Sequence, residues 1–92
     1  MKAYLQRLKP GSDGVWYYSI QIQRDLLGDW QVLREWGRSG SPGTLRQVSY
    51  ETHAEAVEAL LSLRRELQRK GYQLVIQEGL NPAMALFMEG GE

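Results

Sequence analysis

The chain has 92 residues, of which 42% are hydrophobic and 24% charged, with no cysteine and a formal net charge of zero. This length and composition predict one small folded domain and exclude a disordered or fibrous chain, and the lack of cysteine excludes disulfides and thiolate metal sites. Zero net charge argues against a strong, sequence-independent nucleic-acid binder, which would be markedly basic.

Two strands are predicted in the first 24 residues. Residues 3–8 are moderately apolar and run into a cluster of turn-forming residues at 9–14. From residue 15 to residue 24 the side chains alternate, with the apolar parity made up of Trp16, Tyr18, Ile20 and Ile22. Such alternation predicts a strand with one buried and one solvent-facing side. Tyr17 lies on the solvent-facing side, as a surface aromatic residue or as part of a binding face.

A hairpin and a further strand are predicted next. Residues 26–29 favour a tight turn with Gly28 at positive φ, which returns the chain into an antiparallel strand over 30–36. The parity of that strand is mixed, because Trp36 shares a side with Arg34 while Leu33 lies on the other. Either both sides are covered, or a β-bulge near the end of the strand re-aims Trp36. A glycine-rich bend over 37–43 and a half-wet strand over 44–51 follow.

One long helix is predicted over residues 53–70. Thr52 followed by Glu55 is a capping-box signature, and Gly71 marks the end of the helix. On a helical wheel the apolar residues form a single stripe, which would dock on one face of the sheet: Ala56, Val57, Leu60, Leu61, Leu63 and Leu67. Arg64 falls within this stripe, where its stem would pack while its charged head reaches solvent. The acidic residues lie early and the basic residues late, which suits the helix dipole and predicts a solvated face.

The C-terminal part predicts a last strand over 73–77 and a short helix over 82–88, because Asn81-Pro82 is typical of an N-cap followed by proline in the first helical position. The apolar side chains of that helix would pack within the chain or against a second copy, since left in water they favour aggregation. The predicted fold class is α+β: an antiparallel sheet of four to five strands with one long helix packed on one face. We assign residues 1–78 to the domain and 79–92 to an apolar tail.

No constellation of residues is typical of an enzyme or a metal site. His53 is the sole histidine and stands at a helix start without cysteine partners, so we expect it to lie on the surface near the cap. The carboxylates of Glu55 and Glu58 are explained by the helix dipole. Residues 37–43 superficially resemble a phosphate-binding loop, but they lack the Gly-Lys-Ser/Thr ending and precede a strand. We therefore expect no catalysis, no metal and no cofactor.

Neither a membrane span nor a signal peptide is predicted. No apolar run approaches the roughly 20 residues that a membrane helix needs, and the N-terminus leads directly into a strand pattern. We therefore expect a cytoplasmic protein without a membrane partner.

The tripeptide Trp36-Gly37-Arg38 combines residue types that suit a ligand with a ring and a phosphate. Trp supplies a flat face, Arg a planar fork of donors, and Gly room for close approach. The alternative interpretation is a core tryptophan at a strand end beside a solvated turn arginine. Residues 1–50 contain seven Lys or Arg against four acidic residues, a net charge of +3, and residues 51–92 contain four against seven, or −3. In the basic half, Arg34 and Arg46 would add salt-sensitive phosphate contacts.

These residues stand in an ordered series, which comprises Tyr17-Tyr18, Ile20-Gln21-Ile22, Leu33-Arg34, Trp36-Gly37-Arg38, Gly40, Gly43, Ala54-Glu55-Ala56 and Lys70-Gly71-Tyr72. The series resembles the WGR domain, a family named for the tripeptide and found in poly(ADP-ribose) polymerases and in short bacterial proteins. The resemblance covers roughly residues 15–72. It implies an antiparallel sheet carrying one helix and, as in the polymerases, contact with DNA ends or breaks. The functional residues of the family match this sequence directly only at Trp36, Gly37 and Arg38.

Two functions are compatible with this pattern. The first is a non-catalytic nucleic-acid-binding module, with DNA favoured over RNA, in which Trp36 stacks on a sugar or base and Arg38 binds a neighbouring phosphate. Stacking contributes on the order of 1–3 kcal/mol per base, so a lone domain with few cations would bind weakly. The alternative is a protein-interaction or dimerisation module in which Trp36 and Tyr17 form part of one interface and the tail contacts a partner.

Overall fold

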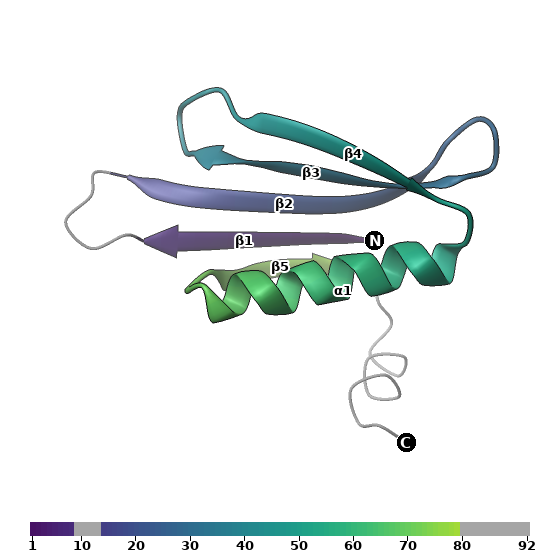
Figure 1. Ribbon diagram of the computed structural model, residues 1–92. Helices are drawn as coiled ribbons and strands as arrows, with labels where there is room; N and C mark the ends of the chain where they lie inside the picture. Colours follow the sequence, from purple (N-terminus) through teal and green to yellow (C-terminus); the bar gives the residue numbers. More distant parts are fainter. Residues whose placement is uncertain (9–13, 80–92) are drawn as a thin grey trace, which may run out of the picture.

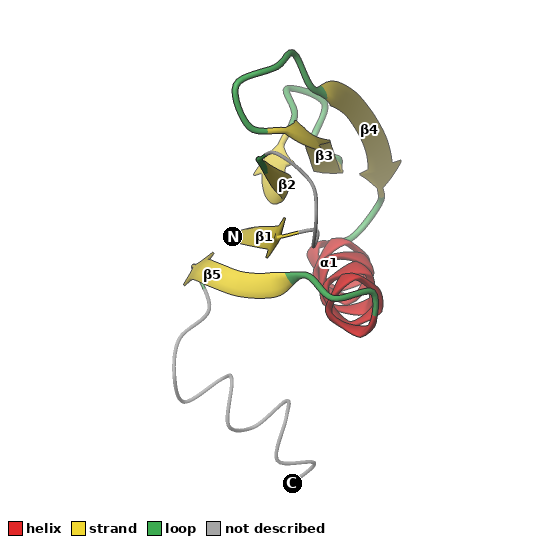
Figure 2. Cartoon of the chain, turned by 90° about the vertical axis from the view of Figure 1, so that its left-hand side faces the viewer, coloured by secondary structure: helices red, strands yellow, loops and turns green. Residues whose placement is uncertain are grey.

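The computed structural model describes residues 1–8 and 14–79. Within these residues the elements in chain order are β1 (Lys2–Leu8), β2 (Val15–Arg24), β3 (Trp30–Arg38), β4 (Thr44–Tyr50), α1 (His53–Arg69) and β5 (Gln73–Glu78). The strands form one antiparallel sheet in the order β4-β3-β2-β1-β5, with α1 packed on one face (Figures 1 and 2). The predicted α+β class is confirmed, with five strands. The helix predicted over 82–88 lies outside the described residues.

The register of the central strands places Trp36 on the helix side of the sheet. β2 and β3 pair without interruption from Trp16 opposite Arg38 to Arg24 opposite Trp30, and β3 pairs with β4 in the same unbroken way. The bulge predicted near the end of β3 is therefore wrong. The register shift in the described sheet lies instead between β1 and β5, at Tyr4. Because residues two apart in a strand share a face, Trp36 keeps the side of Val32.

The other alternative for β3, in which both sides of the strand are covered, is not found either. Among the described elements α1 is the only one that packs on the sheet, and it packs on the side of Val32. Leu33, on the opposite side, is half-buried by its neighbours within the sheet. Polar residues and Leu33 share that second face because an antiparallel sheet tolerates one face in water.

The helix begins and ends close to the predicted positions. The Glu55 backbone N–H donates to Thr52 Oγ1 at 3.1 Å, and the Thr52 backbone N–H donates to Glu55 Oε1 at 3.1 Å, so the predicted capping box is present. Gly71, with φ of 99°, lies just after the last turn. Arg64 is half-buried, so its stem packs as predicted. Its charged head does not simply extend into solvent, because Nε is buried and Nη1 donates to Gln77 Oε1 at 3.1 Å, which ties the helix to β5.

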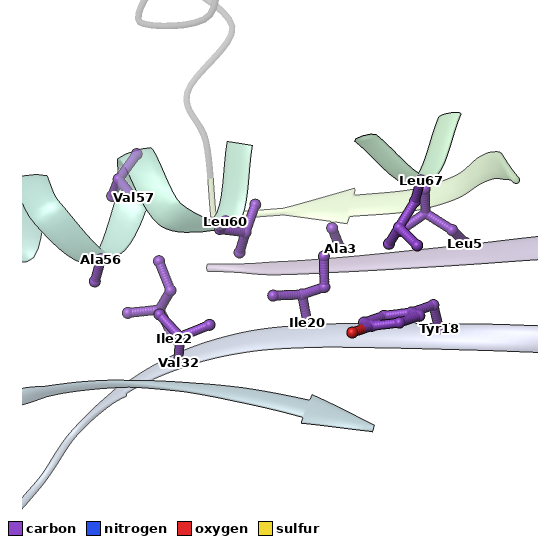
Figure 3. Close-up of a cluster of buried hydrophobic side chains, with 10 residues drawn as sticks. All are labelled: Ala3, Leu5, Tyr18, Ile20, Ile22, Val32, Ala56, Val57, Leu60 and Leu67. Carbon is purple, nitrogen blue, oxygen red and sulfur yellow. The ribbon is translucent and has the colours of Figure 1, made fainter. Parts of the chain in front are cut away.

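The core lies between α1 and the strands β1, β2 and β3. Its buried members are Ala3, Leu5, Tyr18, Ile20, Ile22, Val32, Ala56, Val57, Leu60 and Leu67 (Figure 3). Four of the six predicted helix positions are buried, whereas Leu61 and Leu63 are half-buried at the sides of the stripe. Trp16, predicted on the buried parity of β2, is only half-buried because it lies near the strand end.

The connectivity takes the helix from one edge of the sheet to the other. It follows β4, which is one edge strand, and precedes β5, which is the other. Seventeen residues span about 25 Å as a helix, and five strands span about 19 Å, so a single helix can join the two edges. At its start the His53 ring lies 4.6 Å from the ring of Trp30, and toward its end Leu67 lies over Leu5 (Figure 3). At the end of β3 and the start of β4, the helix-side residues Arg38, Thr44 and Arg46 are exposed.

We predict that Leu60→Ala lowers the free energy of unfolding by about 2–5 kcal/mol, because Leu60 is fully buried and alanine leaves a cavity in the core. Urea denaturation followed by circular dichroism measures the change. Ser62→Ala, on the exposed side of the same helix, is the control and should alter the unfolding free energy by less than about 0.5 kcal/mol. Equal effects of the two substitutions would contradict the packing described here.

We also predict that Thr52→Ala destabilises the domain by about 1 kcal/mol, since it removes the hydrogen bond to the Glu55 backbone N–H. Glu55→Ala removes the reciprocal bond. Because the two residues act on one another, the double variant should lose less than the sum of the two single losses. Strict additivity in thermal or urea unfolding would show that the box does not act as a unit.

Candidate nucleic-acid interface

Five side chains gather at the corner formed by the end of β3 and the start of β4, on the helix side of the sheet. We call this set the hairpin corner; its members are Trp16 of β2, Arg34, Trp36 and Arg38 of β3, and Arg46 of β4. Their shared side follows from the register, because Trp16 lies opposite Arg38 and Arg34 lies opposite Arg46. Opposite residues of an antiparallel pair have their Cβ atoms about 4.5–5.5 Å apart. The corner therefore holds three arginines and two indoles.

Trp36 joins the hairpin corner to the core. Its ring stacks on Tyr18, with centroids 5.3 Å apart and an interplanar angle of 11°, and Tyr18 in turn meets the edge of Tyr72 at 6.2 Å. The Arg34 guanidinium carbon lies 5.6 Å from the centre of the indole ring. Trp36 is half-buried. Its position therefore agrees in part with the interpretation as a core tryptophan and in part with the interpretation as a surface residue that can contact a ligand. It is packed on a core tyrosine and still has surface at the rim of the sheet.

Arg38 lies two residues beyond Trp36 on the same side and is exposed, as the predicted site requires. It passes close to Gly14, since a Cβ built on that glycine would stand 2.9 Å from Arg38 Nε. Gly14 has φ of 114°, a conformation that L side chains rarely adopt. The turn into β2 and the guanidinium of Arg38 are therefore packed against each other.

Arg34 and Arg46 form a like-charge pair across β3 and β4. Arg46 is exposed, and Arg34 is half-buried with its Nε atom buried and without a hydrogen-bond partner in the described part of the chain. Both guanidinium charges act on the Tyr18 hydroxyl. Burial raises the pKa of Tyr18, and the positive charges of Arg34 and Arg46 offset part of that rise.

Trp16 was missed as a site residue in the sequence interpretation, which placed it on the buried side of a strand. Its indole Nε1 is buried without a hydrogen-bond partner among the described residues, and its cross-strand partner is Arg38. Buried donors without partners are uncommon in folded proteins and require an explanation. The signal that could have identified Trp16 is the pairing of the β2–β3 hairpin. The length of the turn between these strands fixes their register, and this register places Trp16 opposite Arg38.

Gly37 faces away from the other two members of its tripeptide. A Cβ on Gly37 would lie 3.1 Å from Gly43 Cα and 3.7 Å from the ring of Tyr17. The Tyr17 hydroxyl donates to Glu35 Oε2 at 3.3 Å, and desolvation and the Glu35 charge raise the pKa of Tyr17. Because Gly37 has no Cβ, the backbone of Gly43 and the ring of Tyr17 can pack closely against it in the β3–β4 hairpin. Tyr17 and Trp36 point to opposite faces, so the single interface proposed for both in the alternative interpretation is not formed.

The two faces of the sheet differ in charge. The arginines of the described strands all lie on the helix side by register: Arg7, Arg24, Arg34, Arg38 and Arg46. Arg24 lies over Trp30, 5.4 Å from its ring centre, at the end opposite the hairpin corner. On the other face of these strands Lys2 is the sole basic residue. The basic character that the first half of the sequence predicts is therefore concentrated on one surface.

Other features of the described residues lie away from this surface. A shallow groove of about 450 Å³ between β4 and the helix is lined by Tyr50, Glu55, Glu58, Ala59, Ser62 and Arg65, and it contains no member of the hairpin corner. Residues 1–8 and 14–79 contain no cluster of three or more potential metal ligands. No helix formed by these residues is long and apolar enough to cross a bilayer.

We predict that Gly43→Ala destabilises the domain by about 1–3 kcal/mol, the range of overpacking in a well-packed site. The new methyl group would collide with the Tyr17 hydroxyl and stand 2.9 Å from the Trp36 carbonyl oxygen. Thermal unfolding compares this variant with Ser41→Ala, an exposed position in the same bend that should have little effect. A Gly43→Ala variant as stable as the Ser41→Ala control would contradict the close packing of the hairpin.

Comparison with known proteins agrees with the geometry. Residues 1–78 match the sequence profile of the WGR domain, a family that generally binds nucleic acid. The chain is also 33% identical over 72 residues to the uncharacterized protein y4dW of Sinorhizobium fredii (strain NBRC 101917 / NGR234), a match that covers 78% of this chain and 35% of the relative. The chain thus spans about a third of the length of that relative. No solved structure matches the present chain. The match over residues 1–78, with the tripeptide Trp36-Gly37-Arg38 at the end of β3, shows that this chain belongs to the WGR domain family.

Proposed function

We propose that this chain is a non-catalytic module that binds nucleic acid, with DNA ends or breaks as the favoured target, through the hairpin corner. The observation that supports this most is the arrangement of Trp36, Arg34 and Arg38 on one part of a basic face. Family membership supports the same conclusion, since WGR domains generally bind nucleic acid.

Each side chain would supply a different part of the contact. Trp36 would offer to a sugar or base the part of its indole that Tyr18 and the Arg34 guanidinium leave open. Arg38 would bind one phosphate, and Arg34 with Arg46 would bind another. The backbone positions of Arg34 and Arg38 lie four residues apart, or about 13 Å along a strand, with Trp36 between them. Stacking and phosphate contacts of this kind are tolerant of sequence and sensitive to salt.

The proposal extends to the organisation of the chain. Residues 1–78 would form the binding module and residues 79–92 an apolar tail, and the module would act by simple binding in the cytoplasm. Gly37 would contribute indirectly, because its lack of a Cβ allows the hairpin that presents Trp36 and Arg38 to close. No catalytic role is proposed for any residue.

Protein interaction is a second candidate, favoured by the face opposite the helix. Across this face runs a row of cross-strand neighbours, which consists of Leu45, Glu35, Ser19, Tyr4 and Ile76. Leu45 is 64% exposed and Ile76 46% exposed, while Tyr4 stacks on Tyr17 with centroids 6.3 Å apart. Aromatic and aliphatic side chains with little net charge are typical of protein contacts. The two candidate functions would therefore use opposite faces.

We predict that Trp36→Ala and Arg38→Ala each weaken binding to short DNA duplexes. Loss of one stacking contact of about 1–3 kcal/mol corresponds to roughly 5- to 150-fold in Kd, and loss of one phosphate contact should lower the dependence of log Kd on log salt by about one. Fluorescence anisotropy with blunt, recessed and 5′-phosphorylated duplexes and with single strands, at low and moderate salt, measures both effects.

Matched controls come from the same face of the same sheet. Arg24→Ala removes an arginine, and Trp30→Phe alters a tryptophan, at the end opposite the hairpin corner; both should leave the affinity nearly unchanged. Because Trp36→Ala also removes a contact to Tyr18, Trp36→Phe is measured beside it, and circular dichroism checks that each variant is folded. Absence of binding by the unaltered chain at low salt would move the assignment to the protein-interaction function.

A further inference from the structure

The like-charge pair of Arg34 and Arg46 requires an explanation of its own. The two residues are direct cross-strand partners on β3 and β4 and point to the same side. Like charges placed directly opposite destabilise a sheet. Among the described residues neither has an ion pair with a carboxylate, since the salt bridge formed there joins Lys70 to Glu66 at 3.8 Å. The sheet thus tolerates an uncompensated repulsion at this position.

The surroundings make the cost greater than that of two solvated arginines. Arg34 is half-buried over the indole of Trp36, and its Nε–H is buried without an acceptor in the described part of the chain. A buried donor without a partner costs about 1–3 kcal/mol in a folded protein. The arrangement is consistent with a site whose acceptor arrives from outside.

A further donor is directed toward the same place. Tyr18 is the cross-strand partner of Trp36, and Ile20 is the partner of Arg34. Figure 3 shows the Tyr18 hydroxyl turned toward Ile20, and the charges of Arg34 and Arg46 both act on this hydroxyl. The charge of Glu66 on the helix also acts on this hydroxyl and raises its pKa, and the Glu66 carboxylate is paired with Lys70.

We propose that Arg34 and Arg46 form a preformed anion site that takes a phosphate group. A phosphate supplies several acceptor oxygens and up to two negative charges, so it would satisfy the guanidinium donors and remove the repulsion between them. The nearby Trp36 indole would contact whatever group the phosphate carries. The phosphate can come from a nucleic-acid backbone or from a small phosphorylated molecule.

This inference deepens the proposed function because it concerns the same corner, but it does not require a nucleic-acid polymer to hold. It distinguishes Arg34 and Arg46 from Arg38, which packs against Gly14 at the end of the strand. The pair is predicted to bind a small free oxyanion, whereas general basic character of the face would not select one.

The test is a titration of the folded chain with pyrophosphate, at constant ionic strength maintained with chloride, followed by nuclear magnetic resonance of the arginine Nε–H and indole Nε1–H signals. The Arg34 and Arg46 signals are expected to shift to saturation. Arg46→Ala should weaken binding by at least about tenfold, and Arg46→Lys should have an intermediate effect because it keeps the charge but loses the planar fork. Arg65→Ala, on the exposed side of the helix, is the control and should bind as the unaltered chain does.

Non-saturating shifts equal to those produced by added chloride, or an Arg46→Ala variant that binds pyrophosphate normally, would overturn the site. A parallel titration with a DNA duplex lacking terminal phosphates separates the two proposals. Binding of that duplex by both the unaltered chain and Arg46→Ala, without pyrophosphate binding, would remove the anion site and leave the nucleic-acid function. Pyrophosphate binding that Arg46→Ala abolishes, without duplex binding, would keep the site and assign it to a small phosphorylated ligand.

Discussion

The path of one helix decides which part of the sheet is buried and which part is left exposed. Helix α1 has to carry the chain from β4 at one edge of the sheet to β5 at the other, and it does so in 17 residues. It lies against Trp30 of β3 at its start and over Leu5 of β1 toward its end. The core lies beneath it, whereas Arg38 and Arg46 near the tripeptide of the WGR family are exposed.

The hairpin corner is held by aromatic contacts that lead outward from the core. Tyr18 is buried between helix and sheet, and it supports Trp36 on one side and Tyr72 on another. Arginines lie over the outer rings, with Arg34 above Trp36 and Arg7 5.9 Å from the ring centre of Tyr72. Rings positioned in this way lose little conformational freedom on binding, so a small surface with few cations can still present an organised site.

The opposite face contributes to the site from behind. Gly37 and Gly43 approach each other across the hairpin beneath Tyr17, whose hydroxyl reaches Glu35. This contact closes the bend between β3 and β4 and so determines where Trp36, Arg38 and Arg46 stand on the front. The glycine of the family tripeptide thus has a packing role, while the residues on either side of it lie on the helix side of the sheet. The arginines of the described strands lie on that same side.

Much of this protein could be predicted from the sequence because it depends on local pattern. Alternation in residues 15–24 and the Thr52–Glu55 box determine strand and helix positions to within about one residue, since each reflects hydrogen bonding and burial among near neighbours. The order of residues around Trp36 was enough to recognise the family. Local pattern could not place the bulge, pair Trp16 with Arg38, or set Arg34 opposite Arg46. Those features depend on strand register, which arises only when segments far apart in the chain pack together.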